Sequence, residues 1–136
     1  WSLQEMAAYK MFLRYGTCIK IVGDIPRDAK HYMINLGEDE FNIALHFNPR
    51  FNYQNNIKKI ICNSKSDGIW GKELKENDFP FVPGTTAEVR PQNQTNGFKV
   101  RLPDGFEFTF PNRLKLQTLN YLEIGHDILV RSVTFK

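Results

Sequence analysis

Short segments in which apolar and polar residues alternate constrain the fold of this chain more than any other feature. Successive side chains of a β-strand point to opposite faces, so this alternation is typical of a strand that is buried on one face. It is clearest in residues 98–102 and 106–110, and the apolar residues Leu129, Val133 and Phe135 share one parity near the C-terminus. The pattern predicts an all-β fold, a two-sheet antiparallel β-sandwich.

Turn-forming residues separate these segments at the spacing expected for such a sandwich. They are Gly23, Gly37, Asp67-Gly68, Pro83-Gly84, Asn96-Gly97, Asp104-Gly105 and Gly125. Most of the 11 phenylalanines should fill the space between the sheets. Residues 89–96 fit less well, because they are polar and include Pro91, which cannot donate to a ladder. We expect a bulged, shortened or edge-like strand there.

Length and charge limit the class of protein. A chain of 136 residues, 41% of them hydrophobic, is the size of one domain, so we expect a single domain over residues 1–136. The net charge of +3 comes without a block of like charges, which argues against a nucleic-acid partner, although a nucleic-acid-binding β-sandwich with exposed aromatics stays an alternative. Apolar stretches fall short of the roughly 20 residues that cross a bilayer, and no signal-like segment is seen. We expect a cytoplasmic protein without membrane insertion.

Motifs for metal binding or catalysis are not recognisable in the sequence. Cys18 and Cys62 are too few and too far apart for a disulfide framework, and no histidine spacing near them indicates zinc, so we expect free thiols, no metal and no cofactor. No nucleophile with its base, carboxylate pair for glycoside hydrolysis or phosphate loop is found, so we expect no enzyme. Asn93-Gln94-Thr95 is a formal glycosylation acceptor, relevant only if the chain enters the secretory route.

Three polar residues at alternate positions form the most informative motif. His46, Asn48 and Arg50, called the triad below, would project together from one strand, while their neighbours point the other way. A sugar hydroxyl both donates and accepts, so its site needs a mixture of imidazole, amide, guanidinium and carboxylate groups. Asn63 and Glu73 complete that mixture. The motif indicates a sugar site, although an isolated triad is also typical of the solvated face of an amphipathic strand.

Trp70 would supply the apolar part of such a site. A pyranose ring has a face of C–H groups, and an aromatic ring lying flat against it contributes burial without competing for hydroxyls. Galactose differs from glucose by one axial hydroxyl, and a pocket built to bond that group rejects the epimer at roughly 1–3 kcal/mol per unpaired group. The alternatives are that Trp70 is a core aromatic and that Asn63 only caps a turn.

Several segments, taken together and in order, resemble the signature of the galectins, over about residues 16–135. The resemblance implies a jelly-roll-like β-sandwich that binds β-galactosides such as lactose or N-acetyllactosamine on glycoproteins or glycolipids. It also implies release from the cell without a signal peptide and a homodimer seam made by the terminal strands. The matching segments are His46-Phe47-Asn48-Pro49-Arg50-Phe51-Asn52, Cys62-Asn63-Ser64-Lys65, Trp70-Gly71-Lys72-Glu73, Phe79-Pro80-Phe81, Leu102-Pro103-Asp104-Gly105 and Phe110-Pro111-Asn112-Arg113.

The same resemblance assigns roles to the site residues. The triad would hold the axial hydroxyl of galactose, and Trp70 would lie against the apolar face of the ring. Asn63 and Glu73 would hold the exocyclic hydroxymethyl group. Arg50, Glu73 and Lys75 would also meet the neighbouring sugar.

The chain departs from the family pattern at Lys75, where Trp-Gly-x-Glu-x-Arg ends in lysine. Lysine keeps the charge but loses the planar fork of arginine. Asn56 stands where many members have an acidic residue supporting that arginine. We therefore expect lactose-type ligands to bind with a weaker or altered second-sugar contact. The alternative is a galectin scaffold that serves as a structural or protein-interaction module with weak or lost sugar binding.

The N-terminal segment leaves the assembly open. Leu3, Met6 and Ala7 recur at helix-like spacing within the first ten residues, but the segment is too short to decide between helix and strand. Because the family forms its homodimer through terminal strands, this unusual start makes the expected homodimer doubtful.

Overall fold

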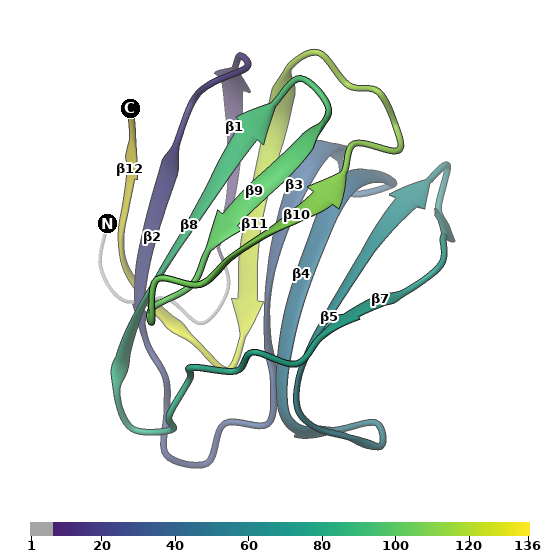
Figure 1. The fold of residues 1–136 in the computed structure, drawn as a ribbon. Coiled ribbons are helices and arrows are strands. Elements are labelled where there is room, and N and C mark those ends of the chain that lie inside the picture. Colours follow the sequence, from purple (N-terminus) through teal and green to yellow (C-terminus); the bar gives the residue numbers. More distant parts are fainter. Residues whose placement is uncertain (1–6) are drawn as a thin grey trace.

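The computed structural model describes the backbone of residues 7–136 and the side chains from Phe12 onward. These residues form strands joined by turns and loops, with no helix among them (Figure 1). The strands are β1 (Ala7–Leu13), β2 (Ile19–Asp24), β3 (Tyr32–Asp39), β4 (Asn42–Tyr53), β5 (Asn56–Ser66), β6 (Ile69–Trp70), β7 (Leu74–Glu76), β8 (Thr86–Gln94), β9 (Gly97–Arg101), β10 (Glu107–Pro111), β11 (Leu119–His126) and β12 (Leu129–Phe135).

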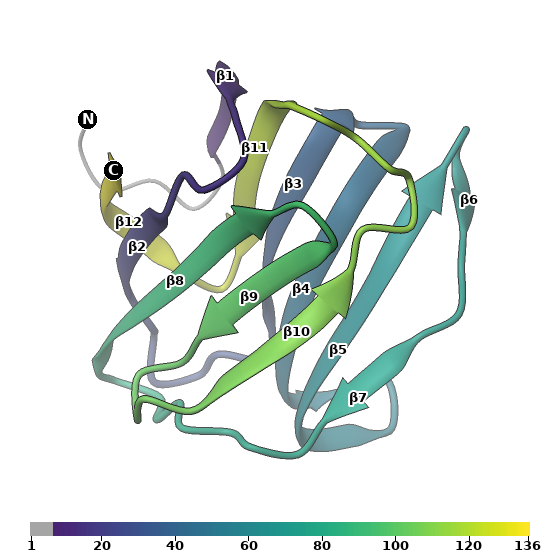
Figure 2. The ribbon, with the colours of Figure 1, turned by 45° about the horizontal axis from the view of Figure 1, so that its top comes forward.

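The strands are arranged in two antiparallel sheets that face each other (Figure 2). The seven-stranded sheet has the order β1-β11-β3-β4-β5-β6, and β7 pairs with β5 as well. The five-stranded sheet has the order β10-β9-β8-β2-β12. The predicted two-sheet antiparallel β-sandwich is confirmed.

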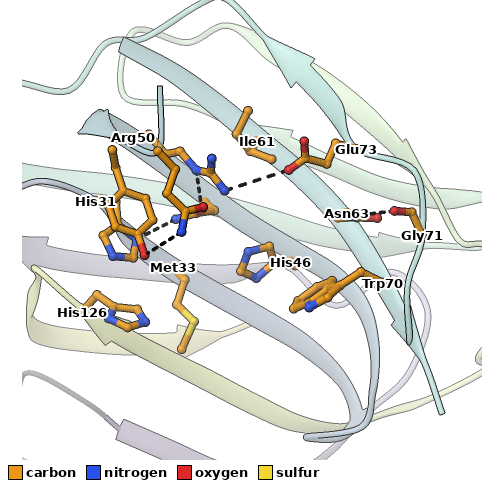
Figure 3. A pocket seen from close by; sticks show the side chains of 13 residues that line it. His31, Met33, His46, Arg50, Ile61, Asn63, Trp70, Gly71, Glu73 and His126 are labelled. Carbon is orange, nitrogen blue, oxygen red and sulfur yellow. Dashed lines mark hydrogen bonds and ion pairs between the residues drawn. The ribbon is translucent and has the colours of Figure 1, made fainter. Parts of the chain in front are cut away.

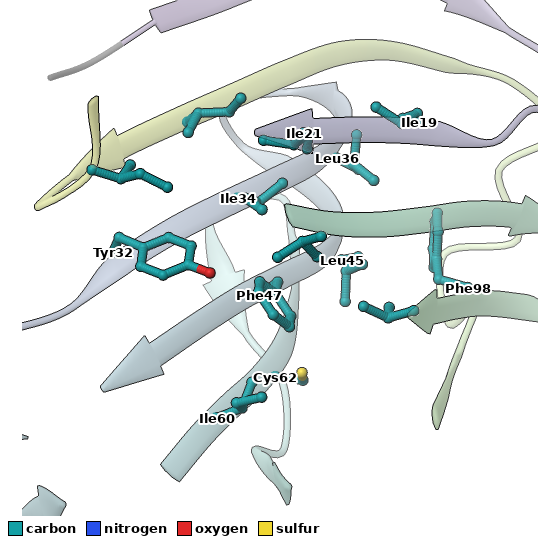
Figure 4. Packing of buried hydrophobic residues seen from close by; sticks show 14 of the residues in the cluster. Ile19, Ile21, Tyr32, Ile34, Leu36, Leu45, Phe47, Ile60, Cys62 and Phe98 are labelled. Carbon is teal, nitrogen blue, oxygen red and sulfur yellow. The ribbon is translucent and has the colours of Figure 1, made fainter. Parts of the chain in front are cut away.

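One apolar cluster fills the space between the sheets (Figure 4). Phe47 from the seven-stranded sheet and Phe98 and Phe110 from the five-stranded sheet are almost completely buried in it. Tyr32 meets Phe81 edge to face, with ring centroids 5.6 Å apart. Most phenylalanines line this core, as expected, because alternate residues of each strand face inward.

The turn predictions are partly correct. Asp67-Gly68 forms the turn between β5 and β6 with positive φ angles at both residues, as a two-residue hairpin requires. The prediction is wrong for Gly23, Gly37 and Gly125, which lie inside β2, β3 and β11. At Gly37 the strand register shifts, and a Cβ atom would clash with the backbone oxygen of Asn42. A glycine is needed at this position because the neighbouring backbone comes close, and not because the chain turns there.

The expectation for the segment around Pro91 is partly correct. β8 is a regular strand of nine residues, so it is neither bulged nor shortened, but from Arg90 to Gln94 it has a continuous ladder with β9 alone, as an edge strand does. Pro91 does interrupt one ladder: β2 pairs with β8 from Thr86 to Val89, and only an isolated bridge between Cys18 and Gln92 follows. The strand tolerates the missing amide hydrogen because its ladder with β9 continues on the other side.

The single parity predicted near the C-terminus is also wrong. β12 carries a register shift between Val130 and Ser132. As a result Val130 is fully buried and Val133 packs against the core, whereas Phe135 is exposed. A bulge inserts one residue into a strand, so it changes which residues face inward.

Ala7 to Lys10 belong to β1, which pairs with β11, so this part of the undecided N-terminal segment is a strand. Leu3 and Met6 lie outside the described residues. In residues 7–136 no helix is long and apolar enough to cross a membrane.

Two smaller expectations concern single side chains. Cys18 and Cys62 are free, as expected, and burial raises the pKa of the Cys62 thiol well above its usual range. Asn93 of the formal glycosylation acceptor is buried, so the folded chain does not offer its amide for modification.

Candidate functional site

A cavity of about 620 Å³ lies on the outer face of the seven-stranded sheet (Figure 3). Strand β4 crosses its floor, with β3 and β5 on either side. The structure brings six of the seven predicted site residues together around it, and Lys75 does not line it. The six are His46, Asn48, Arg50, Asn63, Trp70 and Glu73.

The triad reaches the cavity because successive side chains of β4 point to opposite faces of the sheet. Phe47 and Phe51 point into the core, so the triad between and beside them faces outward. Antiparallel pairing sets His46 opposite Asn35 of β3 and Asn63 of β5, and directly opposite residues share a face. Register therefore places polar side chains from three strands on one surface.

His46 is held as a neutral hydrogen-bond acceptor. Its Nδ1 lies 2.6 Å from Asn35 Oδ1, and Asn35 turns this oxygen toward it because Asn35 Nδ2 donates to Glu123 Oε1 at 3.0 Å. An amide oxygen only accepts, so Nδ1 carries the hydrogen and Nε2 keeps a lone pair. Burial, followed by the charges of Arg50 and Lys65, lowers the pKa of His46 to about 4.

Asn48 and Arg50 hold each other in place. Asn48 Nδ2 donates to the backbone oxygen of Tyr32 at 2.7 Å, and Arg50 Nε donates to Asn48 Oδ1 at 2.9 Å. Arg50 is largely buried, and its Nη2 lies 4.0 Å from Glu73 Oε2. A buried guanidinium needs such partners to offset its lost hydration. The remaining N–H groups of Arg50 are left for a ligand.

Asn63 joins the site to the hairpin that carries the tryptophan. Its Nδ2 donates to the backbone oxygen of Gly71 at 3.0 Å, and its Oδ1 accepts from the Ser64 amide at 2.8 Å. Arg113 Nη1 also donates to Asn63 Oδ1, at 3.3 Å, and to Ser64 Oγ, at 3.2 Å. Asn63 thus fixes local structure and keeps one amide hydrogen for a ligand. Arg113 stands in a segment that resembles the galectins but was given no role.

Trp70 presents its ring at the cavity. The residue is 46% exposed, so the core alternative is wrong. Its ring centroid lies 4.7 Å from that of His46, and Lys65 Nζ lies 4.6 Å from the indole centroid. These neighbours hold the indole beside the triad, where an apolar ligand face can reach it.

Lys75 and Asn56 lie outside the cavity. Lys75 is opposite Ile61 in the ladder between β5 and β7, and so shares the outer face with it. Among the described residues, Glu73 forms an ion pair with Arg50 and none with Lys75. Asn56 sits where the β4–β5 hairpin turns and donates to the backbone oxygen of Gln54 at 3.1 Å.

The cavity is lined by seven further residues to which the sequence analysis gave no site role: His31, Met33, Tyr53, Gln54, Ile61, Gly71 and His126. His31 and Met33 share the parity of Asn35 along β3, so alternation could have found them. His126 has a φ of 68° at the end of β11, a backbone turn that no local pattern indicates. In the described part of the chain, no cluster of three His, Cys, Asp or Glu side chains could hold a metal ion.

A two-sheet sandwich with fixed polar groups and an exposed indole over one sheet defines a sugar-binding β-sandwich, the class of lectins. The family model of galactoside-binding lectins matches residues 6–135. The chain therefore belongs to the galactoside-binding lectins, the galectins, which are carbohydrate-binding proteins and not enzymes.

Individual galectins resemble the chain over almost its whole length. Galectin-1 of Ovis aries is 45% identical over 131 residues, 96% of this chain and 97% of the sheep protein. The complex of toad ovary galectin with thio-digalactose superposes with a TM-score of 0.94 at 36% identity, covering 98% of this chain and 99% of the toad chain. A homodimeric agglutinin from chicken liver has a TM-score of 0.93 at 36% identity, covering 96% and 99%.

Proposed function

We propose that this protein is a β-galactoside-binding lectin whose cavity takes galactose-terminated glycans such as lactose and N-acetyllactosamine, carried on glycoproteins or glycolipids. The observation that supports this most is the pairing of a neutral acceptor, His46 Nε2, with the guanidinium of Arg50 on one strand. The toad galectin complex with thio-digalactose supports the choice of sugar. The scaffold without useful sugar binding is not favoured.

The triad discriminates the axial hydroxyl. A hydroxyl donates one hydrogen and accepts at its lone pairs, so it can donate to His46 Nε2 while it accepts from an N–H of Arg50. Asn48 Oδ1 keeps one lone pair beside them. Glucose points its 4-hydroxyl away from this group, which leaves these buried polar atoms unpaired.

The remaining groups fix the orientation of the ring. Trp70 covers its C–H face, and the free amide hydrogen of Asn63 and the carboxylate of Glu73 hold the hydroxymethyl oxygen. Arg50 and Glu73 also reach the second sugar, while Lys75 contacts it only from outside the cavity. This arrangement needs no cofactor and no metal.

Calorimetry with lactose and cellobiose tests the proposal, because these disaccharides differ only in the configuration at C4 of the terminal sugar. We expect heat with millimolar lactose and none with cellobiose. Trp70→Ala should abolish the lactose signal, while Ile69→Ala, which removes an exposed apolar side chain from the same short strand, should leave it unchanged. A folded protein that gives no heat with lactose would contradict the proposal and favour the interaction-module alternative.

The family also suggests how the protein assembles and where it acts. We propose one carbohydrate-recognition domain that forms a homodimer, supported by the homodimeric chicken agglutinin, so that two sites can crosslink glycans. Sedimentation at micromolar concentration tests this. We also propose a cytoplasmic protein that is released without a signal peptide, which continued release under a block of transport from the endoplasmic reticulum would test.

A further inference from the structure

The outer face of the five-stranded sheet carries two adjoining hollows, on the side of the molecule opposite the sugar cavity. One has a volume of about 430 Å³ and the other of about 170 Å³. Both are lined by Arg90 of β8 and Arg101 of β9, so they meet along these side chains. Figure 2 shows β8, β9 and β10 side by side in this sheet. The two hollows together, called the trough below, extend along β8 from Thr86 to Gln92.

The two arginines of the trough are placed directly opposite each other. Arg90 and Arg101 are partners in the ladder between β8 and β9. Like charges in such a position destabilise a sheet. Arg90 Nε donates to Glu88 Oε2 at 2.7 Å, and Arg101 Nε donates to Glu107 Oε2 at 3.0 Å. The terminal Nη groups of both guanidiniums form no hydrogen bond to a described residue, so these donors are left for a ligand.

The two carboxylates do not cancel the positive charge around the trough. Glu88 Oε1 lies 3.6 Å from Lys20 Nζ, and Glu107 Oε1 lies 3.4 Å from Lys99 Nζ. Each glutamate therefore serves two cations, the lysine and the arginine to which it is bonded. Two cations against one carboxylate leave one positive charge in excess in each group of three. The face attracts anions even though every carboxylate on it is paired.

The free guanidinium ends suit oxyanions. A guanidinium presents its N–H groups in a planar fork that matches the oxygens of a sulfate, phosphate or carboxylate group. From Thr86 to Gln92 the trough follows β8 for roughly 20 Å, at about 3.3 Å per residue. This length suits a linear chain that carries several anionic groups, because a single small ion would fill only part of it.

The two ends of the trough offer partners for hydroxyl groups. Thr86 Oγ1 donates to Asp24 Oδ1 at 2.7 Å and keeps its lone pairs. Gln92 Nε2 donates to the backbone oxygen of Gly16 at 3.2 Å and keeps its second hydrogen. A sugar chain carries hydroxyls beside its anionic groups, so it can use both kinds of partner.

The lining of the trough argues against two other kinds of chain. Proteins bind single-stranded nucleic acids by stacking the bases on aromatic side chains, and none of the described residues that line the trough is aromatic. Peptides that bind by strand addition need an open sheet edge, whereas the trough lies over the face of β8 and β9. A sugar chain with anionic groups needs neither feature.

We propose that the trough binds a sulfated polysaccharide, whose sulfate esters accept hydrogen bonds from the Nη groups of Arg90 and Arg101. A bound sulfate offsets the repulsion between these two arginines. Lys20 and Lys99 keep the neighbouring carboxylates paired while the arginines turn to the ligand. The trough shares no residue with the sugar cavity, so the protein can hold a sulfated chain on one face independently of a galactoside on the other.

Calorimetry with a heparin oligosaccharide, with the same oligosaccharide after removal of its sulfates, and with a single-stranded RNA of equal charge tests the trough. Millimolar lactose is present throughout to occupy the cavity. The variant is Arg90→Gln/Arg101→Gln, which removes both guanidiniums from solvent-accessible positions. Arg131→Gln is the matched control, because Arg131 is an exposed arginine of the same sheet that donates through Nε to Asp24 Oδ2 at 2.7 Å and does not line the trough.

We expect the heparin oligosaccharide to bind in the presence of lactose and to weaken as the salt concentration rises. Removal of the sulfates should lower its affinity by at least about tenfold, and the double variant should lose about as much. Arg131→Gln should keep the wild-type affinity for the heparin oligosaccharide, and RNA should bind more weakly than this oligosaccharide. Circular dichroism confirms folding of the variants.

Absence of heparin binding, displacement of heparin by lactose or an equal loss in Arg131→Gln would each overturn the trough as the site. Displacement would assign the ligand to the cavity, and an equal loss would assign it to the general positive charge. RNA that binds as tightly as the heparin oligosaccharide would overturn the choice of a sulfated sugar. Lactose binding is measured separately, so its absence would overturn the proposed function and leave the trough in place.

Discussion

The two outer faces of the sandwich are both polar, but they hold their polar groups differently. On the five-stranded sheet, charged side chains form ion pairs that are open to solvent, such as Arg101 with Glu107 at 3.0 Å. On the seven-stranded sheet, several polar groups at the cavity are buried and hydrogen-bonded within the protein. The buried ones are Asn35, Asn48, Arg50 and Asn63.

The difference shows which face can tell similar sugars apart. Exposed ion pairs contribute about 0–1 kcal/mol and leave their side chains mobile. Buried polar groups are costly unless they are bonded, so each one has a fixed position and a fixed donor or acceptor role. The neutral Nε2 of His46 is such a fixed acceptor. Discrimination between sugar epimers needs groups of this kind.

The largest expected effect compares an arginine from each face. Arg50→Ala should weaken lactose binding by about a thousandfold, because it removes a buried, hydrogen-bonded charge and frees Asn48 and Glu73. Arg101→Ala removes an arginine from the opposite face and should leave lactose affinity unchanged. Calorimetry on both variants, with circular dichroism to confirm folding, makes the comparison. Equal losses in the two variants would mean that the faces do not differ as described.

The second largest expected effect is the pH dependence of stability, to which His46 on the cavity face contributes most. The pKa of His46 is about 4 in the folded protein and about 6.5 when unfolded, so the unfolded chain binds more protons between these values. The contribution of His46 therefore lowers the free energy of unfolding by about 3 kcal/mol as the pH drops from about 6.5 to about 4.

Urea unfolding across this pH range measures the effect. His46→Gln should remove that share of the pH dependence. Glu107→Gln, on the solvent-exposed face, should alter it far less. An unchanged pH dependence in His46→Gln would show that burial does not repel the proton.

The interior between the faces offers a buried polar group without a partner. The Tyr32 hydroxyl is buried and has no hydrogen-bond partner among the described residues. Tyr32→Phe should therefore raise the free energy of unfolding by about 1 kcal/mol. Thermal or urea unfolding measures this, with Tyr53→Phe at the partly exposed rim as the control. A loss of stability in Tyr32→Phe would mean that the hydroxyl is satisfied.

The smallest effect concerns Lys75, an exposed residue at the edge of the binding face. Lys75→Arg should strengthen lactose binding by about threefold, because a planar fork can hold Glu73 and a sugar hydroxyl together. Galactose alone should bind unchanged, since it lacks the second sugar. Calorimetry with both sugars checks this, and an unaltered affinity for lactose would remove Lys75 from the site.

The fold could be predicted because alternation and turn residues are local signals. Residues 98–102 and 106–110 show the strand period directly, and most of them lie in β9 and β10. Phe98, Phe108 and Phe110 face the core, whereas Phe106, just before β10, is exposed. The errors at Gly37 and Phe135 and the incomplete expectation at Pro91 share one cause. Each depends on how a strand meets its neighbours, through a register shift, a second ladder or a bulge, and these long-range features leave no local pattern.

The candidate site also has a part that local sequence signals predict and a part that depends on long-range pairing. Parity along one strand places the triad together, so the sequence alone was sufficient for it. The tautomer of His46 depends on Asn35 and Glu123, and the hairpin of Trp70 depends on Arg113. These partners come from other strands and loops, so only the assembled register brings them to the site.

A crystal structure of the protein with lactose would show directly whether the triad and Trp70 hold galactose. We expect the galactose 4-oxygen at hydrogen-bonding distance, about 3 Å, from His46 Nε2 and the Arg50 guanidinium, with the C–H face of the ring against Trp70. A lactose molecule with its glucose in this position, or bound away from the triad, would contradict it.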